Sequence, residues 1–186
     1  MAKYVRITLA LTAVVSIFFG AAFVNTVTAA SAKEIDIKVD GALERFYNEV
    51  SSGKKFLEEA KGVLVFPSVI KAGFGIGGEY GEGALRIGGK TVDYYSTAAA
   101  SIGFQLGAQS KTVIIVFLEK HALKKFHEAS GWEAGVDGSV ALVTVGAGGS
   151  IDTTNIKVPI VGFVFSNKGL MYNLTLEGSK MTKLKR

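Results

Sequence analysis

The stretch KAGFGIGGEYGEG, residues 71–83, decides between two very different folds. From Gly73 to Gly78 it has the G-x-G-x-x-G spacing of a dinucleotide-binding turn, in which a helix follows the third glycine and holds the phosphates at its N-terminus. The residues that follow here, EYGEGALRIGGK, do not favour a helix. The alternation of glycine with Phe74 and Ile76 instead predicts a β-strand with one bare face. We therefore expect no nucleotide site.

The same alternation recurs in SIGFQLGAQ, residues 101–109, where Ile102, Phe104, Leu106 and Ala108 share one face and glycine and polar residues share the other. Glycine costs about 0.5–1 kcal/mol in a strand relative to alanine. A sheet that contains so many glycines is therefore expected to curve strongly, or to bring another backbone or a ligand close to its bare face. Both explanations suit a half-open barrel or a strongly coiled sandwich.

The rest of the chain predicts one α+β domain, residues 33–186. After Lys61 the apolar period changes from that of a helix to that of a strand. We expect about eight or nine antiparallel strands, with one inserted helix at residues 121–130. The other predicted strands are residues 62–66, 91–96, 99–109, 112–120, 135–148, 158–166 and 170–178.

An amphipathic helix is predicted to precede the sheet, from Glu34 to about Val50. Its apolar stripe recurs at steps of three and four residues and consists of Ile35, Val39, Leu43, Phe46 and Val50. The opposite face carries charges of both signs. This stripe suits a helix that covers one face of the sheet, and it also suits a helix that lies on a membrane surface. Both alternatives remain open at this point.

The first 32 residues are typical of a secretory signal peptide. Lys3 and Arg6 precede an apolar run, Ile7–Val24, and Ala30-Ser31-Ala32 forms an A-x-A cleavage site. An uncleaved membrane anchor is the alternative, since 18 apolar residues are close to the length that spans a bilayer. We expect an exported protein that resides in the periplasm or cell envelope after cleavage near Ala32.

The predicted mature chain, from Lys33 onward, has 19 basic and 16 acidic residues, a net charge of +3. This charge is too diffuse for a nucleic-acid-binding protein but favours an anionic surface. The chain contains no cysteine, so neither a disulfide nor a lipid-modified cysteine is available.

The sequence contains little that suggests catalysis. His121 and His127 are six residues apart and so lie on different faces of the predicted helix, which does not suit a shared metal. The G-x-S-x-G motif of hydrolases is absent. Glu79 and Glu82 are the only evident acid pair, and they suit the solvated end of a hairpin. We expect neither an enzyme nor a cofactor.

Basic residues are better placed for a surface role. Each Lys or Arg near an anionic bilayer contributes about 1 kcal/mol to binding, so a group of four is enough for reversible attachment. Two groups occur in the sequence, at the junction between helix and sheet and in the C-terminal tail: Lys54, Lys55, Lys61 and Lys71, and Lys180, Lys183, Lys185 and Arg186.

Four segments of the chain closely resemble the SYLF domain, also described as a fungal-type actin-binding domain. They are AKGVLVFPSVIKAGFGIGGEYGEGAL, YYSTAAASIGFQLGAQSKTVIIVFL, ALKKFHEASGWEAGVDGSVAL and VPIVGFVFSNKGLMYNLTLEGSKMTKL. The resemblance extends from about Ala42 to Lys183. It implies a lipid-binding module, because animal members bind phosphoinositides, partly through an amphipathic N-terminal helix, and fungal members bind and bundle actin.

This chain differs from the animal and fungal members because it has a predicted signal peptide and lacks a partner-binding module. Actin is therefore not the expected partner. We predict an exported, non-enzymatic domain that binds anionic phospholipid peripherally. Headgroups would meet Lys54, Lys55, Lys61 and Lys71, and acyl chains would meet Val39, Leu43 and Phe46. The alternative is a structural or protein-interaction module of the envelope that assembles through a strand edge.

Overall fold

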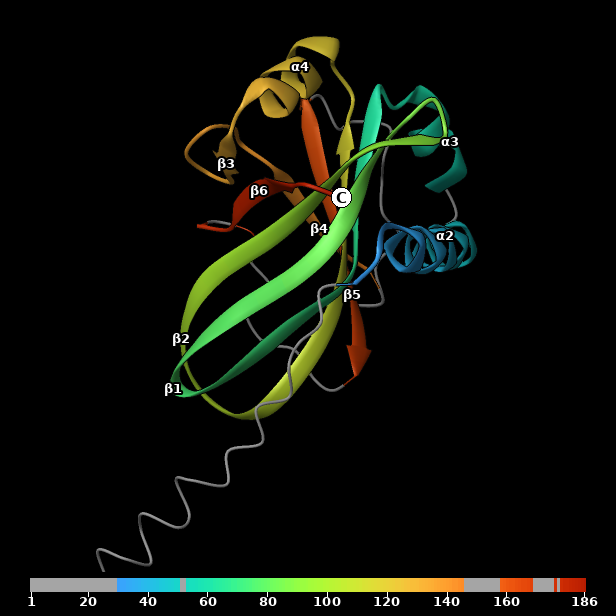
Figure 1. Ribbon diagram of the computed structural model, residues 1–186. Helices are drawn as coiled ribbons and strands as arrows, with labels where there is room; N and C mark the ends of the chain where they lie inside the picture. The colour runs from blue at the N-terminus through green and yellow to red at the C-terminus, as the bar shows by residue number, and fades with distance from the viewer. Residues whose placement is uncertain (1–29, 51–52, 146–157, 169–175, 177) are drawn as a thin grey trace, which may run out of the picture.

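The computed structural model describes residues 30–50, 53–145, 158–168, 176 and 178–186. These residues form three helices and six strands, and Figure 1 shows a strongly curled sheet with two helices against one side and the third at one end. The helices are α2 (Ala32–Glu49), α3 (Gly53–Glu59) and α4 (Lys120–Glu128). The strands are β1 (Gly62–Ile87), β2 (Lys90–Phe117), β3 (Gly131–Glu133), β4 (Ala141–Val145), β5 (Ile160–Lys168) and β6 (Lys180–Leu184).

Strands β1 and β2 form one long antiparallel hairpin. Gly88 and Gly89 connect them with φ angles of 57° and 78°, as a tight two-residue hairpin turn requires. The register shifts three times along the hairpin: between Phe66 and Val69, between Gly73 and Gly75, and between Leu85 and Arg86. These irregularities bend the strands without ending them. Several runs that we predicted as separate strands therefore join, and the described residues form six strands.

The sheet is mixed, whereas the sequence predicted a wholly antiparallel one. Its strand order is β3-β6-β2-β5-β4, with β1 on the other side of β2. The pair β4 and β5 is parallel, and the other pairs are antiparallel. The α+β class, the strong curl, the N-terminal helix and the inserted helix are confirmed.

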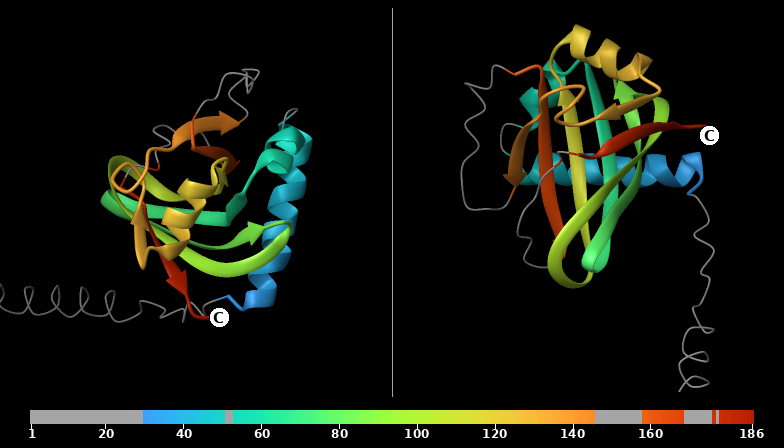
Figure 2. Two further views of the ribbon diagram at one scale, coloured as in Figure 1. Left: turned by 90° about the horizontal axis from the view of Figure 1, so that it is seen from above. Right: turned by 90° about the vertical axis from the view of Figure 1, so that its left-hand side faces the viewer.

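The curled sheet has a separate hydrophobic core on each face. On the inner face α4 packs Leu123 and Phe126 against residues of the curled hairpin, and Trp132 of β3 joins the same core. On the outer face α2 and α3 cover residues of β1, β2 and β5. Figure 2 shows α2 running across the long strands, while α4 lies at the end of the molecule away from the bend of the hairpin.

The bare glycine face of β1 packs against the first half of the same strand. A Cβ added at Gly81 would lie 2.8 Å from the carbonyl oxygen of Ser68, and one added at Gly83 would overlap the carbonyl oxygen of Val65. The curl brings these backbones together, and only glycine leaves enough space. Both physical reasons inferred for the glycines, curvature and close backbone approach, are therefore confirmed at these positions.

Helix α2 begins two residues earlier than predicted because Ser31 caps it. The Ser31 side chain accepts a hydrogen bond from the Glu34 amide, and the Glu34 carboxylate accepts one from the Ser31 amide, which completes a capping box. None of the helices described here is both long and apolar enough to span a membrane. Most of the predicted signal peptide, residues 1–29, lies outside the described residues, and so does most of the predicted strand at 170–178.

Candidate functional site

The outward face of the hairpin bend is apolar. Ile70, Ile76 and Tyr80 of β1 are 53%, 78% and 48% exposed. Every second residue of this part of β1 faces outward, and none of the described outward residues is charged. We call the following exposed residues of β1 and β2 the bend patch: Ile70, Ala72, Ile76, Gly78, Tyr80, Ala98 and Ala100. An exposed apolar group of this kind usually marks a binding surface.

The charged residues of the same segment face inward. Lys111 is 2% exposed, and its ammonium lies 2.5 Å from a carboxylate oxygen of Glu79. Lys71 approaches the other oxygen of Glu79 at 3.5 Å. A sheet with one wet face normally places charges outside and apolar side chains inside. The bend has the opposite arrangement, which is unfavourable for a surface that stays in water.

The bend patch lies on the same sheet face that α2 covers. Val63, Val65 and Ala84 of β1 are buried under the helices. The bulge after Phe66 and the alternation of the strand carry this outer face from Val65 to Ile70, and from Ala84 back to Tyr80. Figure 1 shows that the helices end before the bend is reached. The patch is thus the uncovered part of an otherwise covered apolar face.

Lys180 lies beside the bend patch. The registers place Tyr80, Ala98 and Lys180 next to one another on β1, β2 and β6. Lys180 and Lys185 are exposed, and neither forms an ion pair with a residue that the structure describes. These two lysines can therefore contact an anionic surface without first breaking an ion pair.

The other two cations of the C-terminal tail are paired. Lys183 lies 2.7 Å from Asp93, which His127 also contacts at 2.5 Å, and Arg186 lies 2.8 Å from Glu82. Burial alone would raise the pKa of Asp93, but the hydrogen bonds from Lys183 and His127 outweigh it and lower that pKa. These pairs fix the tail to β1 and β2.

Two of the three predicted acyl-chain contacts are inaccessible. Val39 and Phe46 are fully buried between α2 and the sheet. The ring of Phe46 meets the rings of Phe163 and Phe165 edge to face, with centroids 4.8 and 5.8 Å apart. Leu43 is half-buried. The apolar stripe of α2 thus covers the sheet in this structure.

The predicted lysines do not form one cluster. Lys54 on α3 and Lys61, which directly precedes β1, are exposed, and the Lys61 ammonium donates to the carbonyl oxygen of Glu59 at 2.9 Å. The side chain of Lys55 lies outside what the structure describes. Lys71 is roughly 30 Å farther along the strand, in its ion pair with Glu79.

Polar contacts hold α2 onto the hairpin. Asp36 accepts hydrogen bonds from the hydroxyl of Thr91 at 2.7 Å and from that of Tyr94 at 2.8 Å. Burial and this bond to Asp36 raise the pKa of Tyr94. The guanidinium of Arg86 lies 2.8 Å from Asp40 and 3.7 Å from Asp36. Removing α2 from the sheet would break these contacts as well as exposing the core.

A pocket of about 640 Å³ lies between α2, α3 and the closed end of the hairpin. Its apolar wall includes Leu43 and Leu57, and its polar wall includes Asp40, Glu44, Glu58 and Arg86. Three carboxylates with one guanidinium give a net negative wall, which repels a lipid phosphate. The bend patch is therefore better suited than this pocket to a membrane.

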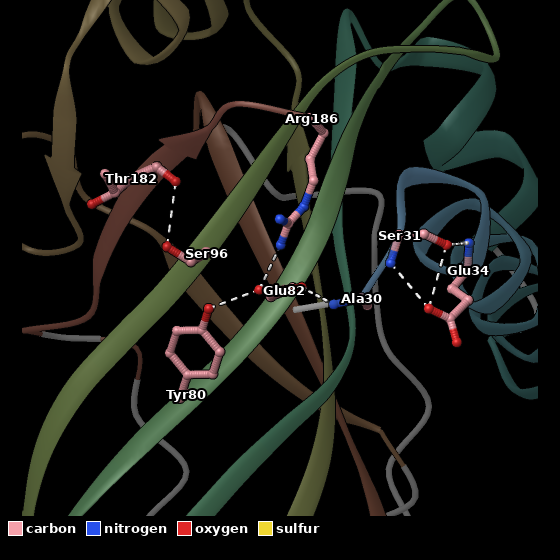
Figure 3. A network of polar contacts seen from close by, with 8 residues as sticks. All are labelled: Ala30, Ser31, Glu34, Tyr80, Glu82, Ser96, Thr182 and Arg186. Carbon is pink, nitrogen blue, oxygen red and sulfur yellow. Dashed lines mark hydrogen bonds and ion pairs between the residues drawn. The ribbon is translucent and has the colours of Figure 1, made fainter. Parts of the chain in front are cut away.

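Glu82 joins the two ends of the described chain, as Figure 3 shows. Its carboxylate accepts hydrogen bonds from the Ala30 amide at 3.2 Å, the Tyr80 hydroxyl at 2.9 Å and the Arg186 guanidinium at 2.8 Å. Burial, followed by the bond to Glu82, raises the pKa of Tyr80. The sequence predicted that Glu79 and Glu82 are solvated. This prediction is wrong for Glu82, which is hydrogen-bonded and largely buried. Glu79 is also ion-paired, with Lys71 and Lys111.

The bend patch was not among the predicted site residues, although the sequence contains a signal for it. Lys71 and Glu79 occupy the same alternate positions as Gly73 and Gly77. Because the glycine face packs inward, those charges must also lie inward and Ile76 must face out. The charged residues therefore mark the inward face of the strand, and the residues that alternate with them mark the exposed face, once the direction of the curl is known.

Residues 98–186 match a family model described as Ysc84, Las17-binding protein actin regulator. The match begins within β2 and includes β6 with Lys180, whereas α2, α3 and β1 precede it. It confirms the resemblance inferred from the sequence. No curated protein matches the chain.

Proposed function

Because the chain carries a Ysc84 (SYLF) domain, and this family consists of lipid- or actin-binding modules, we propose that it is an exported, non-enzymatic protein that binds anionic membranes peripherally. The bend patch is the proposed contact surface. The observation that supports this choice is the inverted hairpin, with Ile70 and Ile76 outside and the Lys111–Glu79 pair inside. In the proposed bound state the apolar side chains enter the bilayer, and Lys180 and Lys185 meet its headgroups.

The energies favour the bend patch over the stripe of α2. Burying the exposed parts of Ile70, Ile76 and Tyr80 in a bilayer supplies on the order of 3–5 kcal/mol, and each nearby lysine adds about 1 kcal/mol. Lifting α2 would transfer its stripe to the bilayer but leave buried sheet side chains such as Val65, Phe163 and Phe165 exposed to water. The cost for these three is on the order of 5–9 kcal/mol, comparable with the whole stability of a typical domain. We therefore propose that α2 stays on the sheet during binding.

Lipid is a better proposed ligand than actin for two reasons. The family name refers to actin regulation, but the leader sequence of this chain directs it away from any cytoskeleton. The described residues of the bend patch are also uniformly uncharged, with Lys180 only at the margin, as a surface that enters a bilayer requires. The proposed location is the periplasm or cell envelope.

Flotation with lipid vesicles tests the proposal. The mature chain is mixed with phosphatidylglycerol-containing vesicles and with phosphatidylcholine vesicles, at low and high salt. We expect recovery with the anionic vesicles and weaker recovery at high salt. Ile76→Ser is expected to reduce the bound fraction several-fold. Ile37→Ser is the matched control, because Ile37 is 61% exposed on α2, away from the patch.

Two outcomes would count against the proposal. If Lys54→Ala combined with Lys61→Ala abolishes flotation while Ile76→Ser does not, the helix–sheet junction is the contact surface instead. If no vesicle recovers the protein and light scattering shows a stable oligomer without lipid, the chain is an assembly module. In that case the exposed edge strands become the candidate interface.

A further inference from the structure

The predicted leader sequence contains four positions at which a signal peptidase could cut. Such enzymes require short, uncharged residues at the last and third-last positions before the cut. In VTAASA, residues 27–32, this requirement is met after Ala29, after Ala30, after Ser31 and after Ala32. The sequence alone favours the last of these, because Ala30-Ser31-Ala32 is the A-x-A match.

The capping box of α2 argues against the cuts after Ser31 and after Ala32. Either cut would remove Ser31, whose hydroxyl caps the amide of Glu34 and whose own amide donates to the Glu34 carboxylate at 3.0 Å. The cut after Ala32 would also place a positive α-ammonium on Lys33, in the first turn of α2. Positive charge at a helix N-terminus is unfavourable because the helix dipole is positive there. A mature chain starting at Lys33 would therefore begin with a destabilised helix.

Glu82 distinguishes the two remaining cuts. The Ala30 nitrogen lies 3.2 Å from the Glu82 carboxylate, and the Glu82 side chain is only 13% exposed. A cut after Ala30 would remove this donor from a largely buried carboxylate. A cut after Ala29 would retain the nitrogen at the same place and convert it from an amide into an ammonium. A charged donor makes the stronger hydrogen bond to a carboxylate.

We propose that signal peptidase hydrolyses the Ala29–Ala30 bond and that the new N-terminus at Ala30 pairs with Glu82. Water adds across the peptide bond, so that Ala29 leaves as the carboxylate end of the leader and Ala30 keeps the ammonium. The pairing joins Ala30 and Arg186 through one carboxylate (Figure 3). This inference rests on the proposed export of the chain.

The first test is N-terminal sequencing and intact mass of the full-length chain, expressed with its own leader in a bacterial host and recovered from the periplasm. We expect the sequence Ala-Ser-Ala-Lys. The variant Ala32→Asp should be processed normally, whereas Ala29→Asp should accumulate uncut. An exported chain that begins at Ser31, Ala32 or Lys33 would overturn the inferred cut and leave the proposed export standing. A chain that remains uncut in the cytoplasm would overturn both.

A second test does not depend on export. Chains starting at Ala30 and at Lys33 are prepared with defined N-termini, each with and without Glu82→Gln. We expect the longer chain to melt about 2–4 °C higher, because it keeps the cap of α2. We also expect Glu82→Gln to lower the melting temperature more in the longer chain than in the shorter one. Equal effects of Glu82→Gln in the two chains would show that Ala30 does not pair with Glu82.

Discussion

Gly83→Ala tests whether the curl of the hairpin depends on a side-chain-free position. Gly83 is buried, and a Cβ there would overlap the carbonyl oxygen of Val65 and lie 2.8 Å from a ring carbon of Phe66. The two halves of β1 would have to separate by roughly 1 Å to restore normal contacts. Overpacking of this kind costs about 1–3 kcal/mol, against a gain of about 0.5–1 kcal/mol from replacing glycine. We expect a net loss of about 1 kcal/mol.

Gly78→Ala is the matched control on the same strand. The nearest atom to a Cβ at Gly78 is the carbonyl oxygen of Ala99 at 3.7 Å, which is an ordinary contact. This variant should therefore be unchanged, or more stable by about 0.5–1 kcal/mol. Urea unfolding monitored by the fluorescence of Trp132, the single tryptophan, measures both variants. If the midpoint falls no further for Gly83→Ala than for Gly78→Ala at equal slope, close backbone approach is not what selects glycine.

Three further predictions concern the cores and the pH dependence of stability. Phe46→Ala should lower the free energy of unfolding, measured in urea, by about 3–5 kcal/mol, because it leaves a cavity between α2 and the sheet. A loss below about 1 kcal/mol would mean that α2 does not pack closely against the sheet. Tyr95 has a buried hydroxyl with no hydrogen-bond partner among the described residues, and burial raises its pKa to about 12. Since the unfolded tyrosine titrates near 10, stability should fall as the pH rises from 10 to 12, and Tyr95→Phe should remove this alkaline loss. The lowered pKa of Asp93 stabilises the fold above its ordinary value of 3.8, and that contribution is lost as the pH falls through the lower folded value; Asp93→Asn should flatten acid unfolding slightly, and an unchanged acid profile would contradict the role of the pair with Lys183.

The curved sheet was predictable because its cause is local in the sequence. Alternating glycines between residues 71 and 83 indicate a bare strand face without any knowledge of distant contacts. The points at which strands end were not predictable in the same way. Pro67 follows the predicted strand at residues 62–66 and usually ends a strand, whereas the structure contains a bulge there that bends β1 and lets it continue. Whether such a signal ends a strand or bends it depends on the partner strand.

The candidate surface was less predictable because it depends on which layer covers which face. The stripe of α2 was identified correctly, but its periodicity does not distinguish a sheet from a bilayer as its partner. Lys71 is basic in the sequence and ion-paired in the structure, because the curl brings Glu79 to it from eight residues away. The parallel pairing of β4 and β5 likewise depends on long-range contacts that no local pattern records.

The length of the β1–β2 hairpin has a consequence for the order of folding. The turn at Gly88 and Gly89 brings Ile87 and Lys90 together first, because their loop is the shortest and has the lowest closure entropy. Pairing then extends through the bend until Gly62 meets Phe117. Helix α2 contacts both Ala84, near the turn, and Val65, near the open end, so its site is complete only after the hairpin has zipped to its full length. Docking of α2 should therefore be a late event, and mutations under the helix should accelerate unfolding more than they slow folding.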